Sequence, residues 1–130
     1  MIWNRKAVRA TKAERERMAA LKLLGCIACR MTGSIAGTPE IHHLLSGNKR
    51  RGHAFTIPLC PWHHRGEMGG LWNATAHERA LGPSLARGSK RFHATFGTDD
   101  ELLARTNQAL ANTFGPNGTV CTNSTEENER

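Results

Sequence analysis

Two short pairs of metal-ligand residues constrain the fold of this chain more than any other feature of its sequence. Cys26 and Cys29 are separated by two residues, and so are Cys60 and His63. This spacing lets both members of a pair bind the same ion, and two such pairs complete the closed tetrahedral set of a structural zinc site. We therefore predict a zinc ion bound by these four residues, with the adjacent His64 as the alternative fourth ligand.

The chain is short enough for a zinc ion to matter to its stability. Its 130 residues suit one domain, but only 38% are hydrophobic and 5% aromatic, and small domains often depend on a metal or a crosslink. We find no secretory signal and no apolar run of roughly 18 residues that would span a membrane. We therefore expect a cytoplasmic protein whose paired cysteines bind metal rather than form disulfides. The remaining cysteine, Cys121, is predicted to be free.

The charge of the chain favours a nucleic-acid partner. The net charge is +7, and sixteen of the eighteen Lys and Arg residues lie between Arg5 and Arg91. A basic surface attracts phosphate backbones, although charge alone also describes an ordinary solvated protein. The predicted DNA contacts are Lys49, Arg50 and Arg51 in the turn 47–52, and Arg65, which follows His63 and His64.

The pattern of caps, glycines and apolar residues predicts an α+β fold with flanking helices. Capping boxes at Thr11, Thr75 and Thr98 each have a Glu three residues later and predict helix starts. Residues 30–40 are expected to form a loop, and 41–45 and 55–59 two short strands. Pro61 begins a helix that ends near Gly69. We predict a basic flexible N-terminus over 1–10, one folded domain over 11–116 and a disordered polar tail over 117–130.

Histidines cluster in the segment that contains the two strands and the second zinc pair. Five of the seven lie within 23 positions: His42, His43, His53, His63 and His64. Neighbours on a helix point about 100° apart, so the last two can serve different sites. Neighbours on a strand point to opposite faces, so we expect His42 and His43 to share a cleft only at a frayed or bulged strand end.

The residue types favour hydrolysis of a phosphodiester bond with one divalent ion. Such an ion polarises the phosphoryl oxygen and stabilises the leaving oxygen, and a neutral imidazole is a suitable base for the attacking water. The sequence has only two aspartates, Asp99 and Asp100, at the start of the last helix. An Asp-rich two-metal site is therefore not expected.

Two short strands followed by a helix, with His-His on the first strand and Cys-Pro-Trp-His-His at the helix start, resemble the HNH (ββα-metal) nucleases. Within them the chain is similar to the phage recombination-enhancement family, the RecA-dependent nucleases known as Ref. The resemblance runs from about Glu14 to Leu110. Its motifs are Leu24-Gly25-Cys26-Ile27-Ala28-Cys29, Ile41-His42-His43-Leu44, the block 52–66 and Phe96-Gly97 before Glu101-Leu102-Leu103.

The resemblance implies a DNA endonuclease of phage or prophage origin that acts where a RecA filament has paired strands. It implies His43 as the general base, His42 and His64 as ligands of a catalytic Mg²⁺ or similar ion, and a bacterial host cell. The central Asn of the motif, which orients the base, is missing, and His53 or Thr56 is the expected substitute. Only about two dozen residues precede Cys26, fewer than the long basic arm expected of RecA-dependent members.

Other interpretations remain open on the sequence alone. A zinc-stabilised DNA-binding module with a degraded site fits the missing Asn, and an RNA-directed nuclease or toxin fits the basic, His-rich composition. Trp62 is predicted to pack against the zinc pair rather than stack on a base. His77 and His93 have no companion histidines nearby in the sequence and are predicted to be structural or exposed.

Overall fold

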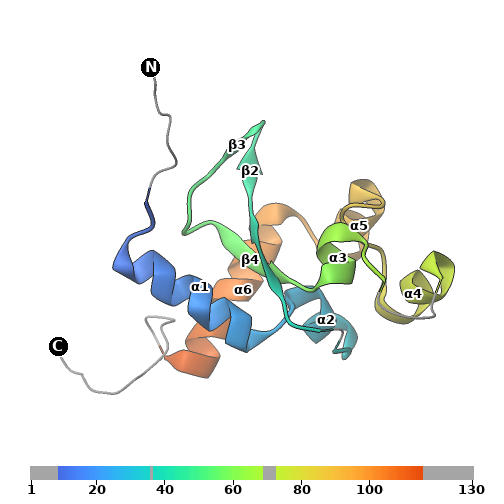
Figure 1. The fold of residues 1–130 in the computed structure, drawn as a ribbon, viewed down its shortest axis with the longest axis horizontal. Helices are drawn as coiled ribbons and strands as arrows, with labels where there is room; N and C mark the ends of the chain where they lie inside the picture. Colours follow the sequence, from blue (N-terminus) through green and yellow to red (C-terminus); the bar gives the residue numbers. More distant parts are fainter. Residues whose placement is uncertain (1–8, 36, 69–72, 116–130) are drawn as a thin grey trace.

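Helices enclose a small antiparallel sheet in the computed structural model, which describes residues 9–35, 37–68 and 73–115 (Figure 1). The elements, in chain order, are α1 (Lys12–Leu24), α2 (Ile27–Thr32), β1 (Glu40–His43), β2 (Leu45–Ser46), β3 (Lys49–Arg50), β4 (Thr56–Leu59), α3 (Pro61–Arg65), α4 (Ala74–Leu81), α5 (Ser89–Phe96) and α6 (Asp99–Phe114). The predicted α+β class with flanking helices is confirmed. None of these helices is long and apolar enough to cross a membrane.

The two longest helices begin where their capping boxes predict. Thr11 precedes α1 and Thr98 precedes α6, and in both cases the hydroxyl accepts from the backbone N–H of the glutamate three residues on. The glutamate carboxylate accepts from the cap N–H in return, so that two otherwise unpaired donors at each helix start are satisfied. Both helices end at a glycine with positive φ, Gly25 and Gly115.

The central sheet is an antiparallel pair of strands, β1 and β4, in regular register. Glu40 pairs with Leu59 and His42 with Ile57, while Ile41 pairs with Pro58 and His43 with Thr56. Directly paired residues lie on one face of a sheet, and neighbours along a strand alternate. The second two-stranded sheet, β2 with β3, forms the projecting hairpin at the top of Figure 1.

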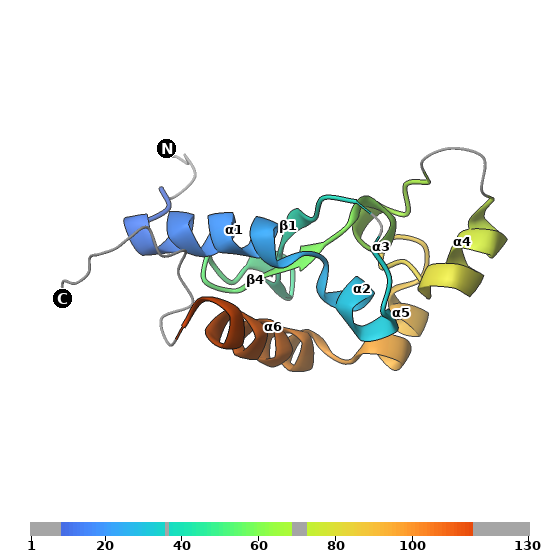
Figure 2. The same ribbon diagram turned by 90° about the horizontal axis from the view of Figure 1, so that it is seen from below.

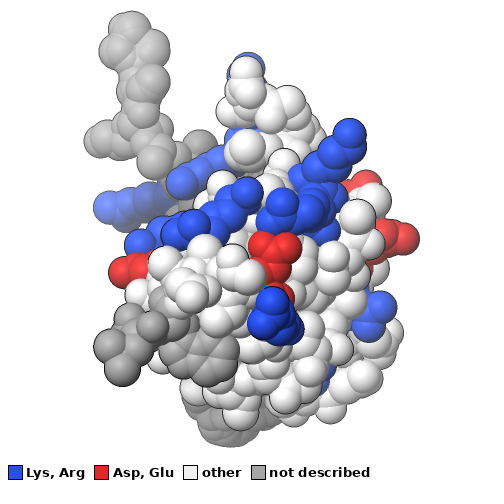
Figure 3. All heavy atoms as spheres, turned by 90° about the vertical axis from the view of Figure 1, so that its right-hand side faces the viewer, with Lys and Arg blue, Asp and Glu red and all other residues white. Residues whose placement is uncertain are grey.

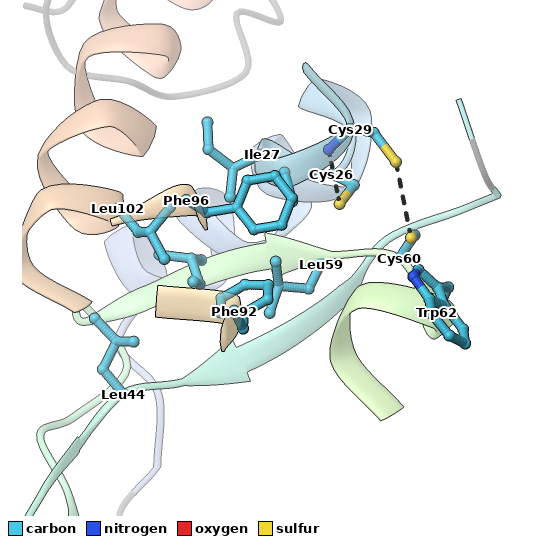
Figure 4. Close-up of a cluster of buried hydrophobic side chains, with 12 residues drawn as sticks. Cys26, Ile27, Cys29, Leu44, Leu59, Cys60, Trp62, Phe92, Phe96 and Leu102 are labelled. Carbon is cyan, nitrogen blue, oxygen red and sulfur yellow. Dashed lines mark hydrogen bonds between the residues drawn. The ribbon is translucent and has the colours of Figure 1, made fainter. Parts of the chain in front are cut away.

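The sheet lies between α1 on one side and α6 on the other (Figure 2). One group of buried residues joins the helices: Ala20, Leu21, Leu24, Ala109 and Leu110. The larger group includes residues of α2, α3 and α5. It contains the three described cysteines with Trp62, Phe92 and Phe96 (Figure 4). The hydrophobic core is therefore continuous with the predicted zinc pairs.

Several predicted boundaries were wrong, each for a local reason. Residues 30–32 belong to α2 rather than a loop, because Cys26 caps a short helix that ends at Gly33. The helix at Pro61 ends at Arg65 because Gly66 adopts a left-handed conformation. Asn73, not Thr75, caps α4, since its side chain accepts from the N–H of Ala76.

The predicted strands over 41–45 and 55–59 are present as β1 and β4. β1 starts one residue early and ends at His43, since Leu45 belongs to β2, and β4 starts one residue late. The predicted tail over 117–130, Cys121 and most of the predicted N-terminal segment lie outside the described residues. The domain limits 11–116 therefore stay a prediction.

Candidate metal centre and histidine site

The four predicted zinc ligands come together in one buried cluster. Cys26, Cys29, Cys60 and His63 are all buried, and their ligand atoms lie within 4.8 Å of one another. Cys29 Sγ is 3.8 Å from Cys60 Sγ, and His63 Nδ1 is 3.4, 3.6 and 3.2 Å from the sulfurs of Cys26, Cys29 and Cys60. A tetrahedral zinc with Zn–S of ~2.3 Å and Zn–N of ~2.0 Å requires S···S of about 3.8 Å and S···N of about 3.5 Å. The donor set therefore fits zinc.

The backbone around the cluster prepares these donors for a cation. Cys26 and Cys60 are both helix N-caps, and their sulfurs accept from the N–H groups of Cys29 and His63. His63 Nε2 lies 2.7 Å from the carbonyl oxygen of Leu81. The Nε2–H group therefore donates to that carbonyl, and the lone pair of Nδ1 faces the sulfurs, as in many metal-bound histidines.

Three thiols this close resist joint ionisation unless a cation neutralises them. Hydrogen bonds to Cys26 and Cys60, together with burial, raise the pKa of the Cys29 thiol. A divalent ion removes this penalty because each thiolate becomes a ligand. The structure also decides between the two histidines, since His63 joins the sulfurs and His64 lies elsewhere.

His64 pairs with His42 on one face of β1. Their ring centroids are 5.0 Å apart at an interplanar angle of 61°. Glu40, two residues before His42 on the strand, contacts His64 Nδ1 at 2.8 Å. Burial, and next the neighbouring His64, lower the pKa of His42 to about 4. At neutral pH, His42 is therefore uncharged and one of its ring nitrogens carries a lone pair.

His43 pairs with a different histidine. Its Nε2 lies 3.1 Å from Nδ1 of His53, and the two ring centroids are 5.2 Å apart. Burial, and then the charges of Arg50 and His53, lower the pKa of His43. The Thr56 hydroxyl donates to the backbone carbonyl of His53 at 3.0 Å. The structure thus places both predicted orienting residues, His53 and Thr56, in one chain of contacts leading to His43.

A cleft shared by His42 and His43 requires a bulged or frayed strand end, but the structure pairs both residues regularly. Both residues hold regular register opposite Ile57 and Thr56, so their side chains leave β1 on opposite faces. The hydrogen bond from the Leu44 N–H to the Phe55 carbonyl continues the pairing beyond the strand. Two histidine pairs, not one shared cluster, therefore flank this end of the sheet.

Two of the four predicted DNA contacts are engaged by carboxylates. The Arg51 guanidinium contacts Asp100 at 2.7 Å. The Arg65 guanidinium donates to both oxygens of Glu40, and it also contacts Glu67 at 2.6 Å. Lys49 and Arg50 are exposed on the β2–β3 hairpin. Figure 3 shows Lys and Arg side chains gathered across the upper half of one face, toward the end that carries this hairpin, with carboxylates between them.

The sequence interpretation missed several polar residues beside the histidines. Glu40 could have been found, because it precedes His42 by two positions and so shares its face of a strand. His93 contacts Asp99 at 2.9 Å, and both act electrostatically on His42. No local signal links these elements, since α5 and α6 approach β1 only in the folded chain.

Trp62 and His77 belong to the core, as predicted for Trp62. Its side chain is 2% exposed and its Nε1–H donates to the carbonyl of Gly82. The His77 ring lies 5.0 Å from that of Trp62 and is buried. Trp62 is therefore not available to stack on a base.

Fold and site together define a small α+β domain with a zinc-type metal centre and two histidine pairs at one end of its sheet. Residues 10–111, more than three quarters of the chain, match the family described as recombination enhancement, RecA-dependent nuclease. The chain belongs to this family. The family is one of nucleases, for which DNA is the implied substrate.

Proposed function

We propose that this protein is a metal-dependent endonuclease of the HNH kind, which hydrolyses phosphodiester bonds in DNA with a histidine base and one divalent ion. The observation that carries the proposal is the arrangement of the four histidines in two pairs at β1. His42 with His64 offers ligands, and His43 with His53 offers an oriented base. The family match supports the nuclease activity and RecA-paired DNA as the substrate.

The pair of His42 and His64 suits a single divalent ion, Mg²⁺ or a similar one. Their rings are close, both are partly exposed, and the lowered pKa of His42 keeps its lone pair free. An ion held there would polarise the phosphate and stabilise the leaving oxygen. Imidazole ligands also accept transition metals readily, so we expect Mn²⁺ to support cleavage at least as well as Mg²⁺.

His43 would act as the general base. When its Nε2–H donates to His53 Nδ1 across 3.1 Å, the lone pair of His43 Nδ1 is left for the proton of the attacking water. Its lowered pKa, caused mainly by burial, favours the unprotonated form of this nitrogen. His53 would thus replace the orienting Asn of related motifs, and Thr56 would position His53 through the His53 carbonyl.

His42 and His43 can act on one substrate, although they lie on opposite faces of β1, if the substrate binds at the unpaired edge of this strand. Within the described residues no strand pairs with the other edge of β1. A phosphate approaching that edge would meet His42 from one face and His43 from the other. Lys49 and Arg50, exposed on the adjacent hairpin, would contact the DNA backbone without reading its sequence. Arg51 and Arg65 are weaker candidates because carboxylates already bind them.

The test is cleavage of labelled single-stranded, duplex and RecA-paired DNA, in Mg²⁺, Mn²⁺ and EDTA, with RNA of the same sequence alongside. Metal-dependent cleavage of DNA supports the proposal, and the preferred DNA form tests dependence on RecA. A gel shift without cleavage on any DNA would favour a zinc-stabilised binding module. Cleavage confined to RNA would favour an RNA-directed nuclease.

A further inference from the structure

Glu40 lies between an imidazole and a guanidinium in a geometry that serves more than a surface ion pair. Its Oε1 is 2.8 Å from His64 Nδ1 and 2.9 Å from Arg65 Nε, and its Oε2 is 3.1 Å from the same Nε. Arg65 Nη2 also contacts Oε2. The carboxylate is therefore held from one side by Arg65 while its Oε1 faces His64.

The local fold explains why these side chains meet. Cys60 caps α3, and the five residues of this helix send His63 to the metal cluster and the next two residues toward β1. Glu40 begins β1 and shares the face of His42. The metal cluster and the Glu40 contacts therefore fix α3 from both sides, and the His64 ring has little freedom to turn.

The contact with Glu40 determines which nitrogen of His64 carries the proton. A carboxylate only accepts hydrogen bonds, so the His64 nitrogen that faces Glu40, Nδ1, must carry the hydrogen. When the ring carries only this one hydrogen, Nε2 has the lone pair. Metal-bound histidines commonly donate their other N–H to a carboxylate, which fixes the tautomer and the ring orientation and strengthens the ligand.

We infer that Glu40 is a positioning residue, held by Arg65, which fixes the tautomer and direction of His64 so that Nε2 is ready to bind the divalent ion. The inference rests on the proposed function, in which His64 is a ligand of that ion. It gives Arg65 a role different from the DNA contact expected from the sequence, since its guanidinium aims the carboxylate rather than a phosphate.

A merely structural role for Glu40, which would neutralise Arg65, is separable from this one. Arg65 has a second carboxylate partner, Glu67, at 2.6 Å. Glu67 has no described contact with His64. Glu67→Gln therefore removes one negative charge from the same guanidinium and leaves His64 untouched, which makes it the matched control for Glu40→Ala.

The experiment uses the full zinc-loaded chain without DNA and measures two quantities. The ¹⁵N chemical shifts of His64 report its tautomer, and Mn²⁺ titration followed by electron paramagnetic resonance reports ion affinity. We expect the Nδ1–H tautomer in the wild type. We expect Glu40→Ala to weaken Mn²⁺ binding ~10- to 100-fold, the usual effect of losing such a partner, with zinc content unchanged. Glu67→Gln should stay within about twofold of wild type.

Two results would overturn the inference: an Nε2–H tautomer of His64 in the wild type, or equal Mn²⁺ affinity in folded Glu40→Ala and Glu67→Gln proteins. If Glu40→Ala does not fold, Glu40→Gln takes its place. An amide can donate or accept, so this variant should admit both tautomers and bind Mn²⁺ several-fold more weakly. Wild-type affinity and a single tautomer in Glu40→Gln would also contradict the inference.

His64→Ala separates this inference from the proposed function. If His64→Ala retains wild-type Mn²⁺ affinity and cleavage, the ligand assignment itself is wrong. If His64→Ala loses both while Glu40→Ala keeps them, only the role of Glu40 is wrong. In the double variant, Glu40→Ala should add no further loss to that of His64→Ala, because it acts through His64.

Discussion

Replacing Cys29 with Ser should remove the bound zinc and unfold the domain. The Cys29 sulfur lies 3.8 Å from that of Cys60 and 3.6 Å from His63 Nδ1, so it is one of four donors around a common centre. A serine hydroxyl keeps the size of the side chain but does not replace a thiolate as a zinc ligand. The remaining ligands would then be buried without a cation.

The structure indicates a large effect. Structural zinc contributes about 10–16 kcal/mol in zinc-finger peptides, whereas the whole free energy of unfolding of a small domain is about 5–15 kcal/mol. Here the buried group beside the metal centre has twelve members, including all three described cysteines, and the other buried group has five. Five buried residues do not sustain a domain by themselves. We therefore expect the free energy of unfolding to fall by at least ~5 kcal/mol. The variant should then no longer unfold cooperatively.

Metal analysis and urea unfolding followed by circular dichroism measure this effect. The wild type should contain one zinc per chain, and Cys29→Ser should contain none and show no cooperative transition. Cys121→Ser is the matched control: the same substitution in a residue that is predicted to be free should leave both results unchanged. A Cys29→Ser protein with the wild-type urea midpoint, or a folded wild type without zinc, would refute the reasoning.

Further predictions concern stability and DNA binding. Arg17 donates to the Thr56 hydroxyl at 3.0 Å and to its carbonyl at 2.6 Å, so Arg17→Met should lower the free energy of unfolding by about 2–3 kcal/mol in a urea titration; a smaller change than ~0.5 kcal/mol would contradict this. The pKa of His42 is lowered to about 4 when folded, so its contribution to stability is present above its unfolded pKa of ~6.5 and is lost as pH falls toward 4. Between pH 7 and pH 5 the free energy of unfolding of the wild type should fall by about 2 kcal/mol more than that of His42→Asn. Equal decreases would refute the lowered pKa of His42. Duplex binding weakens with salt, and the slope of log K against log salt concentration should become shallower by about 0.9 for each of Lys49 and Arg50 that is replaced with Ala. An unchanged slope would exclude the hairpin from the DNA contact.

Local chemistry made much of the fold predictable from the sequence. The capping boxes at Thr11 and Thr98 mark the starts of the two longest helices. Such a box involves only the capping residue and the three residues after it, so it can be recognised in the sequence. The zinc set was predictable because each pair is local in sequence. The box at Thr75 failed because Asn73 offers a competing cap two residues earlier.

The surroundings of the histidines were less predictable because they depend on contacts between distant segments. The Arg65 side chain looks like a phosphate ligand in the sequence, but folding brings it to Glu40, 25 positions away. Arg51 meets Asp100 across 49 positions. The sequence suggested that His53 orients the base, but not that its ring contacts that of His43. This contact forms only when the hairpin between the two residues has folded.

His43 is the proposed base of a metal-dependent phosphodiesterase site. The most direct test is the single-turnover rate of DNA cleavage by His43→Ala in Mg²⁺ or Mn²⁺, with and without added imidazole. We predict that the rate falls ~100-fold or more, as is typical for loss of a general base, that the zinc content is unchanged and that imidazole partly restores the rate. A folded His43→Ala protein that cleaves DNA at the wild-type rate would contradict this prediction.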